Sequence, residues 1–136
     1  MNKPPSNLAL STIGQYLPDD LIALFCQGIE EFNHGKYYDC HETLESVWQK
    51  QIGEEREMTQ GIIQIAVALY HLERKNEVGA VKLLERGICR IEQFEDLQVG
   101  LQLSDLSHSA RKLLTQIGDK TFTPTERRAP LTISFL

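Results

Sequence analysis

Residues 58–72 read Met-Thr-Gln-Gly-Ile-Ile-Gln-Ile-Ala-Val-Ala-Leu-Tyr-His-Leu, and this stretch decides the fold. On a helix that advances about 100° per residue, its apolar side chains point almost all the way round the axis. A helix with this pattern is buried on most sides and therefore needs several neighbours. The polar side chains that interrupt it fall within about 40° of one another, and they are Gln60, Gln64 and His71. Buried amides and imidazoles need hydrogen-bond partners, because an unsatisfied polar group costs about 1–3 kcal/mol.

The preceding segment, His41-Glu42-Thr43-Leu44-Glu45-Ser46-Val47-Trp48, supplies the nearest partners in the sequence. Helical spacing places His41, Leu44 and Trp48 on one stripe, with Glu45 on its flank. We expect this stripe to face inward against residues 58–72, so that His41 and Glu45 meet the polar stripe of that helix. Any site in the protein is therefore predicted where these two segments meet.

Further amphipathic segments surround this pair. Apolar periodicity and helix-breaking residues predict helices at about 19–34, 37–51, 55–75, 77–95 and 104–117, with the third most buried. Short connections between them predict an all-α fold, a compact bundle of four to five antiparallel helices. We expect residues 1–136 to form a single helical domain, with a core at about 19–117. An irregular lead-in precedes this core, and a tail at 118–136 either packs back on the bundle or meets a partner.

Composition and charge restrict the class of protein. Hydrophobic residues make up 41% and charged residues 24% of the 136 residues, as in soluble globular proteins. The formal net charge of −5 argues against nucleic acid as a partner. Cys26, Cys40 and Cys89 follow neither a disulfide nor a metal spacing, which predicts reduced thiols in a cytoplasmic protein. The longest apolar run is too short for a bilayer, so we expect no membrane partner, whereas a homo-oligomer or a protein partner is compatible with the sequence.

A set of motifs between about residues 25 and 114 resembles a known family. The motifs are Phe32-Asn33 and Gly35 followed by Tyr37 or Tyr38, an H-x-x-x-E-x-x-W/Y pattern at His41, Glu45 and Trp48, Gln60-Gly61-Ile62-Ile63-Gln64, Tyr70-His71, and Asn76 with Gly79-Ala80. Together they resemble a family of small helical bacterial and archaeal proteins catalogued as domain of unknown function 309. The resemblance implies an all-helical fold and a motif that has been suggested to bind metal. It implies no established activity.

A metal or small-ligand site is one interpretation of the polar residues. A histidine and a glutamate at positions i and i+4 lie on one helix face and can bind the same ion. His71 from the facing helix would complete a set of two histidines and one carboxylate, His41, Glu45 and His71, which suits zinc or non-haem iron. Gln60 and Gln64 would hydrogen-bond to the ligands, and Tyr38 and Trp48 would wall the pocket. If the protein is an enzyme, this set favours a metal-dependent hydrolase.

The alternative interpretation is structural. The same side chains can form a hydrogen-bonded polar layer that sets the register of the helices, because buried polar groups usually satisfy one another. The protein would then be a non-catalytic helical module that binds another protein through a groove or through its apolar tail. The sequence leaves the choice between enzyme and binding module open, and metal content distinguishes the two.

Overall fold

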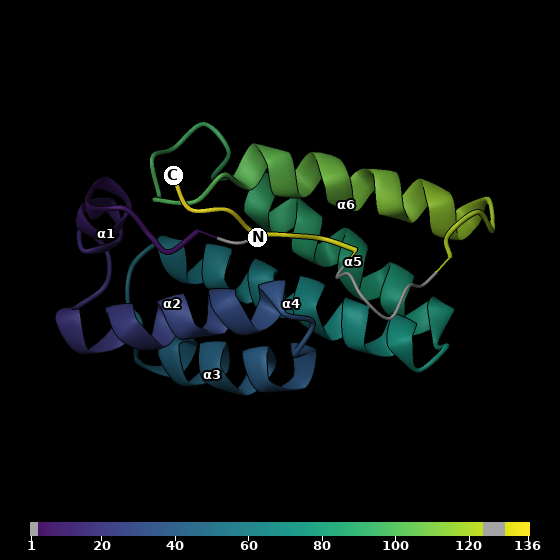
Figure 1. Ribbon diagram of the computed structural model, residues 1–136, viewed down its shortest axis with the longest axis horizontal. Helices are drawn as coiled ribbons and strands as arrows, with labels where there is room; N and C mark the ends of the chain where they lie inside the picture. Colours follow the sequence, from purple (N-terminus) through teal and green to yellow (C-terminus); the bar gives the residue numbers. More distant parts are fainter. Residues whose placement is uncertain (1–2, 124–129) are drawn as a thin grey trace.

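The computed structural model describes residues 3–123 and 130–136. The regular secondary structure of these residues consists of α-helices joined by turns and loops. Its helices are α1 (Asn7–Ile13), α2 (Asp19–Asn33), α3 (Tyr37–Lys50), α4 (Glu55–Glu73), α5 (Glu77–Glu92) and α6 (Leu103–Gly118). From α2 to α6 each helix contacts the next, and α4 and α5 share the most extensive contact (Figure 1). The predicted all-α class is confirmed. The described part of the chain contains six helices, whereas the predicted bundle had four to five.

The additional helix is α1, and the prediction of an irregular lead-in was wrong for residues 7–13. Ser6 caps this helix, because its hydroxyl oxygen accepts a hydrogen bond from the Ala9 amide at 3.1 Å. A helix of two turns is too short to be stable alone, so tertiary packing has to hold it. Ala9 and Ile13 provide that packing, since both are fully buried. The signal that sequence analysis missed was therefore the serine cap.

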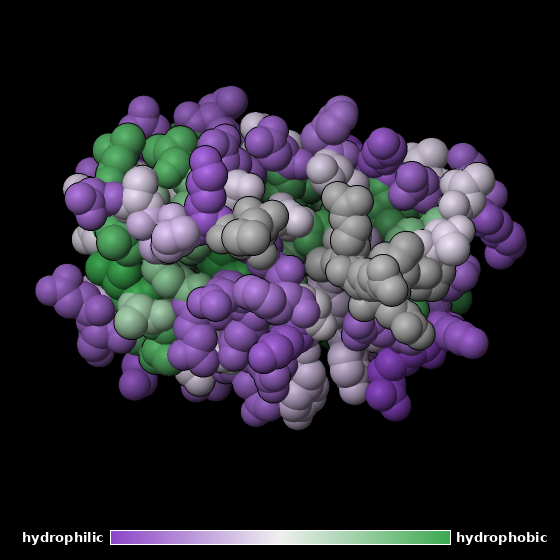
Figure 2. Space-filling model, in the orientation of Figure 1, coloured by the Kyte–Doolittle hydropathy of each residue, from purple (hydrophilic) through white to green (hydrophobic). Residues whose placement is uncertain are grey.

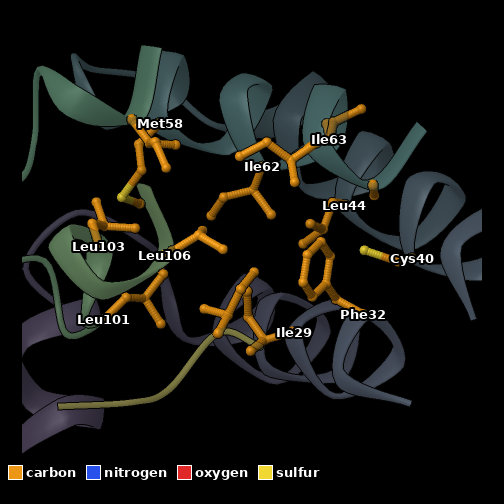
Figure 3. Packing of buried hydrophobic residues seen from close by; sticks show 14 of the residues in the cluster. Ile29, Phe32, Cys40, Leu44, Met58, Ile62, Ile63, Leu101, Leu103 and Leu106 are labelled. Carbon is orange, nitrogen blue, oxygen red and sulfur yellow. The ribbon is translucent and has the colours of Figure 1, made fainter. Parts of the chain in front are cut away.

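The interior of the protein is organised around α4, as predicted. Figure 3 shows Ile62 of α4 pointing into the space between Leu44 of α3, Phe32 of α2 and Leu106 of α6. The buried residues of α4 are Met58, Thr59, Gly61, Ile62, Ile63, Ile65, Ala66, Ala68 and Leu69. This set surrounds most of the helix axis, which explains why α4 has neighbours on several sides.

The C-terminal segment packs back on the body, which is one of the two outcomes predicted for it. Leu131 and Ile133 are buried, and Phe135 forms an isolated antiparallel bridge with Leu101. In Figure 1 this yellow segment crosses the molecule between α6 and α2. It therefore covers the seam between the first and last helices of the core.

The surface is mostly hydrophilic on the face that Figure 2 shows, and hydrophobic residues gather at the end that carries α1. Three leucines of the described residues are exposed, namely Leu8, Leu97 and Leu136. No helix in the described ranges combines the length and the apolar character that crossing a membrane requires. Cys40 is a buried free thiol, whereas Cys89 is exposed.

Candidate functional site

The inward face of α3 differs by one position from the predicted face. The side chains that point into the core are Tyr37, Cys40, Leu44 and Val47, followed by Gln51 just after the helix. His41, Glu45 and Trp48 are only partly buried and lie at the edge of this face. The expectation that His41 faces inward is met only in part, because Cys40 takes the core position and His41 is partly exposed. Cys40 is small and apolar, which suits a close helix contact.

His41 and Glu45 form a pair at the edge of the inward face of α3. Nε2 of His41 lies 2.8 Å from Oε2 of Glu45, and the two side chains are 31% and 43% exposed. Spacing by four residues places both on the same side of the helix, as the sequence predicted. The pair is reachable from solvent, and the carboxylate fixes the orientation of the imidazole ring.

Two polar residues of α4 form hydrogen bonds with residues that follow α4 in the chain. Gln64 accepts a hydrogen bond from Nε of Arg90 on α5 at 3.0 Å, and the same guanidinium also pairs with Glu57. Nδ2 of Asn76 donates to Nδ1 of His71 at 3.3 Å. Gln60 is partly buried on the same helix. The amide of Gln64 and the ring of His71 are thus hydrogen-bonded to α5 and to the turn before it.

The predicted set of His41, Glu45 and His71 is only partly brought together. His41 and Glu45 pair directly, whereas His71 takes part in a separate hydrogen bond with Asn76. Within residues 3–123 and 130–136, histidine, cysteine, aspartate and glutamate side chains form no group of three that could hold a metal ion. The local partners explain this arrangement, since each ring is satisfied beside its own position in the chain. Binding of a ligand by these residues stays a prediction.

Four rings form a continuous row across the outer side of α3 and α4, and we call these residues the aromatic row: His41, Tyr38, Tyr70 and His71. Successive ring centroids are 6.0 Å apart from His41 to Tyr38, 5.8 Å from Tyr38 to Tyr70 and 6.3 Å from Tyr70 to His71. The guanidinium carbon of Arg74 lies 5.3 Å from the centre of the Tyr70 ring. Tyr38 is 54% exposed, so the row is accessible. The aromatic row links the two predicted histidines through the rings of two tyrosines.

Trp48 occupies the opposite end of the contact between α3 and α4. The guanidinium carbon of Arg56 lies 3.7 Å from the centre of its indole ring, and Nε of Arg56 donates to the Trp48 carbonyl oxygen at 2.9 Å. The arginine therefore covers one face of the ring and ties the end of α3 to the start of α4. This arrangement gives Trp48 a contact with Arg56 that links α3 to α4.

A cleft lies between the C-terminal ends of α2 and α4 on one side and α6 on the other. It is lined in part by Asn33, Tyr37, Glu73 and Lys112. The hydroxyl of Tyr37 is buried, and this burial raises the pKa of the phenol well above its ordinary value. Partial burial also raises the pKa of the Glu73 carboxyl. Both acidic and basic side chains line the cleft. None of the predicted site residues is among those that line it.

Two comparisons with known proteins agree with the resemblance found in the sequence. Residues 25–83 match the family described as domain of unknown function (DUF309), which confirms that resemblance. This range contains the whole aromatic row together with Glu45, Trp48, Gln60 and Gln64. The uncharacterized protein YpuF of Bacillus subtilis (strain 168) is 45% identical over 60 residues. That match covers 43% of this chain and 34% of YpuF, about a third of the relative's length. No solved structure matches the chain.

Proposed function

We propose that this chain, which matches the DUF309 family over residues 25–83, is a non-catalytic helical module that binds a protein partner on its aromatic row. The observation that carries the proposal is the row itself, with ring centroids about 6 Å apart across two neighbouring helices. Tyrosine and arginine are enriched where proteins bind one another, because one side chain offers both apolar area and a hydrogen bond. A partner that presents apolar side chains and hydrogen-bond acceptors fits this surface.

The positions of the rings in the aromatic row are fixed before binding, because the residues belong to two packed helices. Tyr38 belongs to α3 and Tyr70 to α4, and the two helices pack on each other. Rings on rigid helices lose little conformational freedom when a partner covers them, since tyrosine has only two rotatable side-chain bonds. Arg74 beside Tyr70 adds a cation that can meet a carboxylate or a carbonyl group.

The pairing of the other polar residues supports a binding role over a metal-centred reaction. Gln64 is engaged by Arg90, and His71 is engaged by Asn76. A metal held by all three residues would need the His71 ring to approach His41 and Glu45, because within the described residues the three side chains form no group that could hold an ion. The metal hypothesis therefore requires a movement of the His71 side chain, whereas binding to the row uses the arrangement as it stands.

Photo-crosslinking in cells of the source organism tests the proposal. Tyr38 is replaced by benzoylphenylalanine, and the matched control carries the same group at His108, an exposed position on α6. We expect one discrete adduct at position 38 that is absent at position 108 and is lost in Tyr70→Ala. Equal crosslinking at both positions, or no adduct at position 38, overturns the proposal.

Metal content provides the second arm of the test. The protein is purified without a nickel column and its zinc and iron are measured by elemental analysis. Stoichiometric metal that disappears in both Glu45→Gln and His41→Ala would favour the metal site over the binding module. We expect no stoichiometric metal in the wild-type protein.

A further inference from the structure

Residues 131–136 occupy a seat built by three distant parts of the chain. The seat consists of Asn33 at the end of α2, residues 100–102 before α6, and Ser6 at the start of α1. Figure 1 shows the yellow segment running between α2 and α6 and ending beside the loop that precedes α6. The seat is a surface distinct from the aromatic row, which lies on α3 and α4.

Asn33 recognises the backbone of a single residue with both ends of its amide. Its Nδ2 donates to the carbonyl oxygen of Ile133 at 2.8 Å, and its Oδ1 accepts from the amide of Ile133 at 2.7 Å. Only an extended chain presents its amide and carbonyl groups to one side in this way. Without such a chain, the buried part of the Asn33 amide loses two partners at once. The seat is therefore complete only when an extended peptide fills it.

The rest of the seat forms backbone hydrogen bonds with the segment, as one β-strand does with another. The amide of Gln102 donates to the carbonyl oxygen of Ser134 at 2.9 Å, and the amide of Leu136 donates to the carbonyl oxygen of Gly100 at 2.9 Å. Leu131 and Ile133 are buried, whereas Thr132 and Ser134 are exposed. This alternation gives specificity for an apolar residue at every second position, as in peptides that add a strand to a sheet edge.

The seat belongs to parts of the body that are anchored without the segment. Phe25, Ile29 and Phe32 hold α2 in the core with no exposed area. The loop before α6 is tied to the body by the hydroxyl of Tyr16, which donates to the carbonyl oxygen of Val99 at 2.6 Å. We therefore expect the seat to keep its shape when the segment leaves.

We infer that the seat is an exchangeable docking site, and that its second occupant is the segment 131–136 of another copy of this chain. The identical segment makes every hydrogen bond described above, so exchange between copies changes no contact within the seat. Phe122 packs against the core, and the chain between Phe122 and Leu131 reaches at most about 30 Å when extended. That length allows the segment of one copy to reach the seat of a neighbouring copy. The product is a dimer in which each copy completes the seat of the other.

Disulfide trapping tests this exchange with full-length chains. Cys89 is exposed and is first replaced by serine. Gln102 and Ser134 then face each other across the seat, and directly paired strand residues lie at a separation that a disulfide can bridge. Chains carrying Gln102→Cys are mixed at high concentration with chains carrying Ser134→Cys, unfolded and refolded together, and oxidised.

Gel electrophoresis without reductant reads the result. We expect a crosslinked heterodimer well above the level of a control mixture of Gln102→Cys with His108→Cys, a thiol on the exposed side of α6. The double variant with both cysteines in one chain should close within that chain, which verifies the seat. Closure of the double variant without heterodimer in the mixture overturns the exchange. Failure of the double variant to close overturns the seat itself.

Discussion

Gly61 of α4 and Gly87 of α5 bring two helix backbones into direct contact. A Cβ atom on Gly87 would lie 2.8 Å from the carbonyl oxygen of Gly61, and one on Gly61 would lie 3.0 Å from that of Gly87. A backbone oxygen cannot turn away as the end of a flexible side chain can. The two glycines therefore set the distance between α4 and α5, the helix pair with the most extensive contact.

We expect Gly87→Ala to lower the free energy of unfolding by about 1–3 kcal/mol, the range for overpacking a close contact. The clash outweighs the gain of about 1 kcal/mol that alanine normally brings to a helix. Gly118→Ala is the matched control, because nothing lies within 4 Å of a Cβ at that helix end. Urea denaturation measures both variants, and equal stability of the two would contradict the close contact.

Trp48 is the single tryptophan of the chain, so its fluorescence reports on the contact with Arg56. We expect Arg56→Ala to shift the emission maximum to longer wavelength, because water reaches the ring face that the guanidinium covers. Arg56→Lys keeps the charge but loses the planar stack and the Nε hydrogen bond, so it should show a smaller shift. Trp48→Ala should lower the free energy of unfolding by about 1–3 kcal/mol, less than for a fully buried ring. An unchanged spectrum in Arg56→Ala argues against the stack.

The rotation of α3 shows where sequence reasoning reached its limit. Leu44 belongs both to the predicted stripe with His41 and Trp48 and to the observed stripe with Cys40 and Val47. Helical periodicity predicted the helix and its ends to within a residue, but the two stripes differ by a single position. The choice between them depends on how α2 and α4 together enclose α3, which one sequence does not reveal.

The hydrogen-bond partners of the polar residues on α4 were also not fully predictable from the sequence. Its partial burial was predictable from the apolar residues around it, but the partner of Gln64 is Arg90, on the next helix in the chain. The prediction considered only the preceding helix, where His41 and Glu45 looked unsatisfied. Those two residues satisfy each other along one helix, which was itself predictable from their spacing.

Alkaline pH should destabilise the protein through its buried tyrosines. Burial raises the pKa of Tyr16 and of Tyr37 above the ordinary value of 10.0. The unfolded chain therefore loses these protons near pH 10 while the folded chain keeps them. The stability that the neutral phenols contribute is fully present below pH 10. Above pH 10, each buried tyrosine lowers the free energy of unfolding by about 1.4 kcal/mol per pH unit.

Absorbance at 295 nm and denaturation at pH 9 to 12 check this expectation. Two of the four tyrosines should ionise only when the protein unfolds. Tyr16→Phe should flatten the decline of stability with pH, although it loses the hydrogen bond to Val99 at every pH. Four tyrosines that all ionise near pH 10 in the folded protein would contradict the buried state of both phenols.

Asn33→Ala should loosen the C-terminal segment without unfolding the helices. The substitution removes both hydrogen bonds to Ile133, and we expect a loss of about 1–3 kcal/mol in the free energy of unfolding. Hydrogen exchange followed by mass spectrometry should show faster exchange of peptides that cover residues 131–136. Asn76→Ala is the matched control, because it removes a helix cap on Gly79 at a distant turn. It should lower stability to a similar degree while the exchange of the segment stays slow. If both variants leave that exchange unchanged, the clamp by Asn33 does not hold the segment in place.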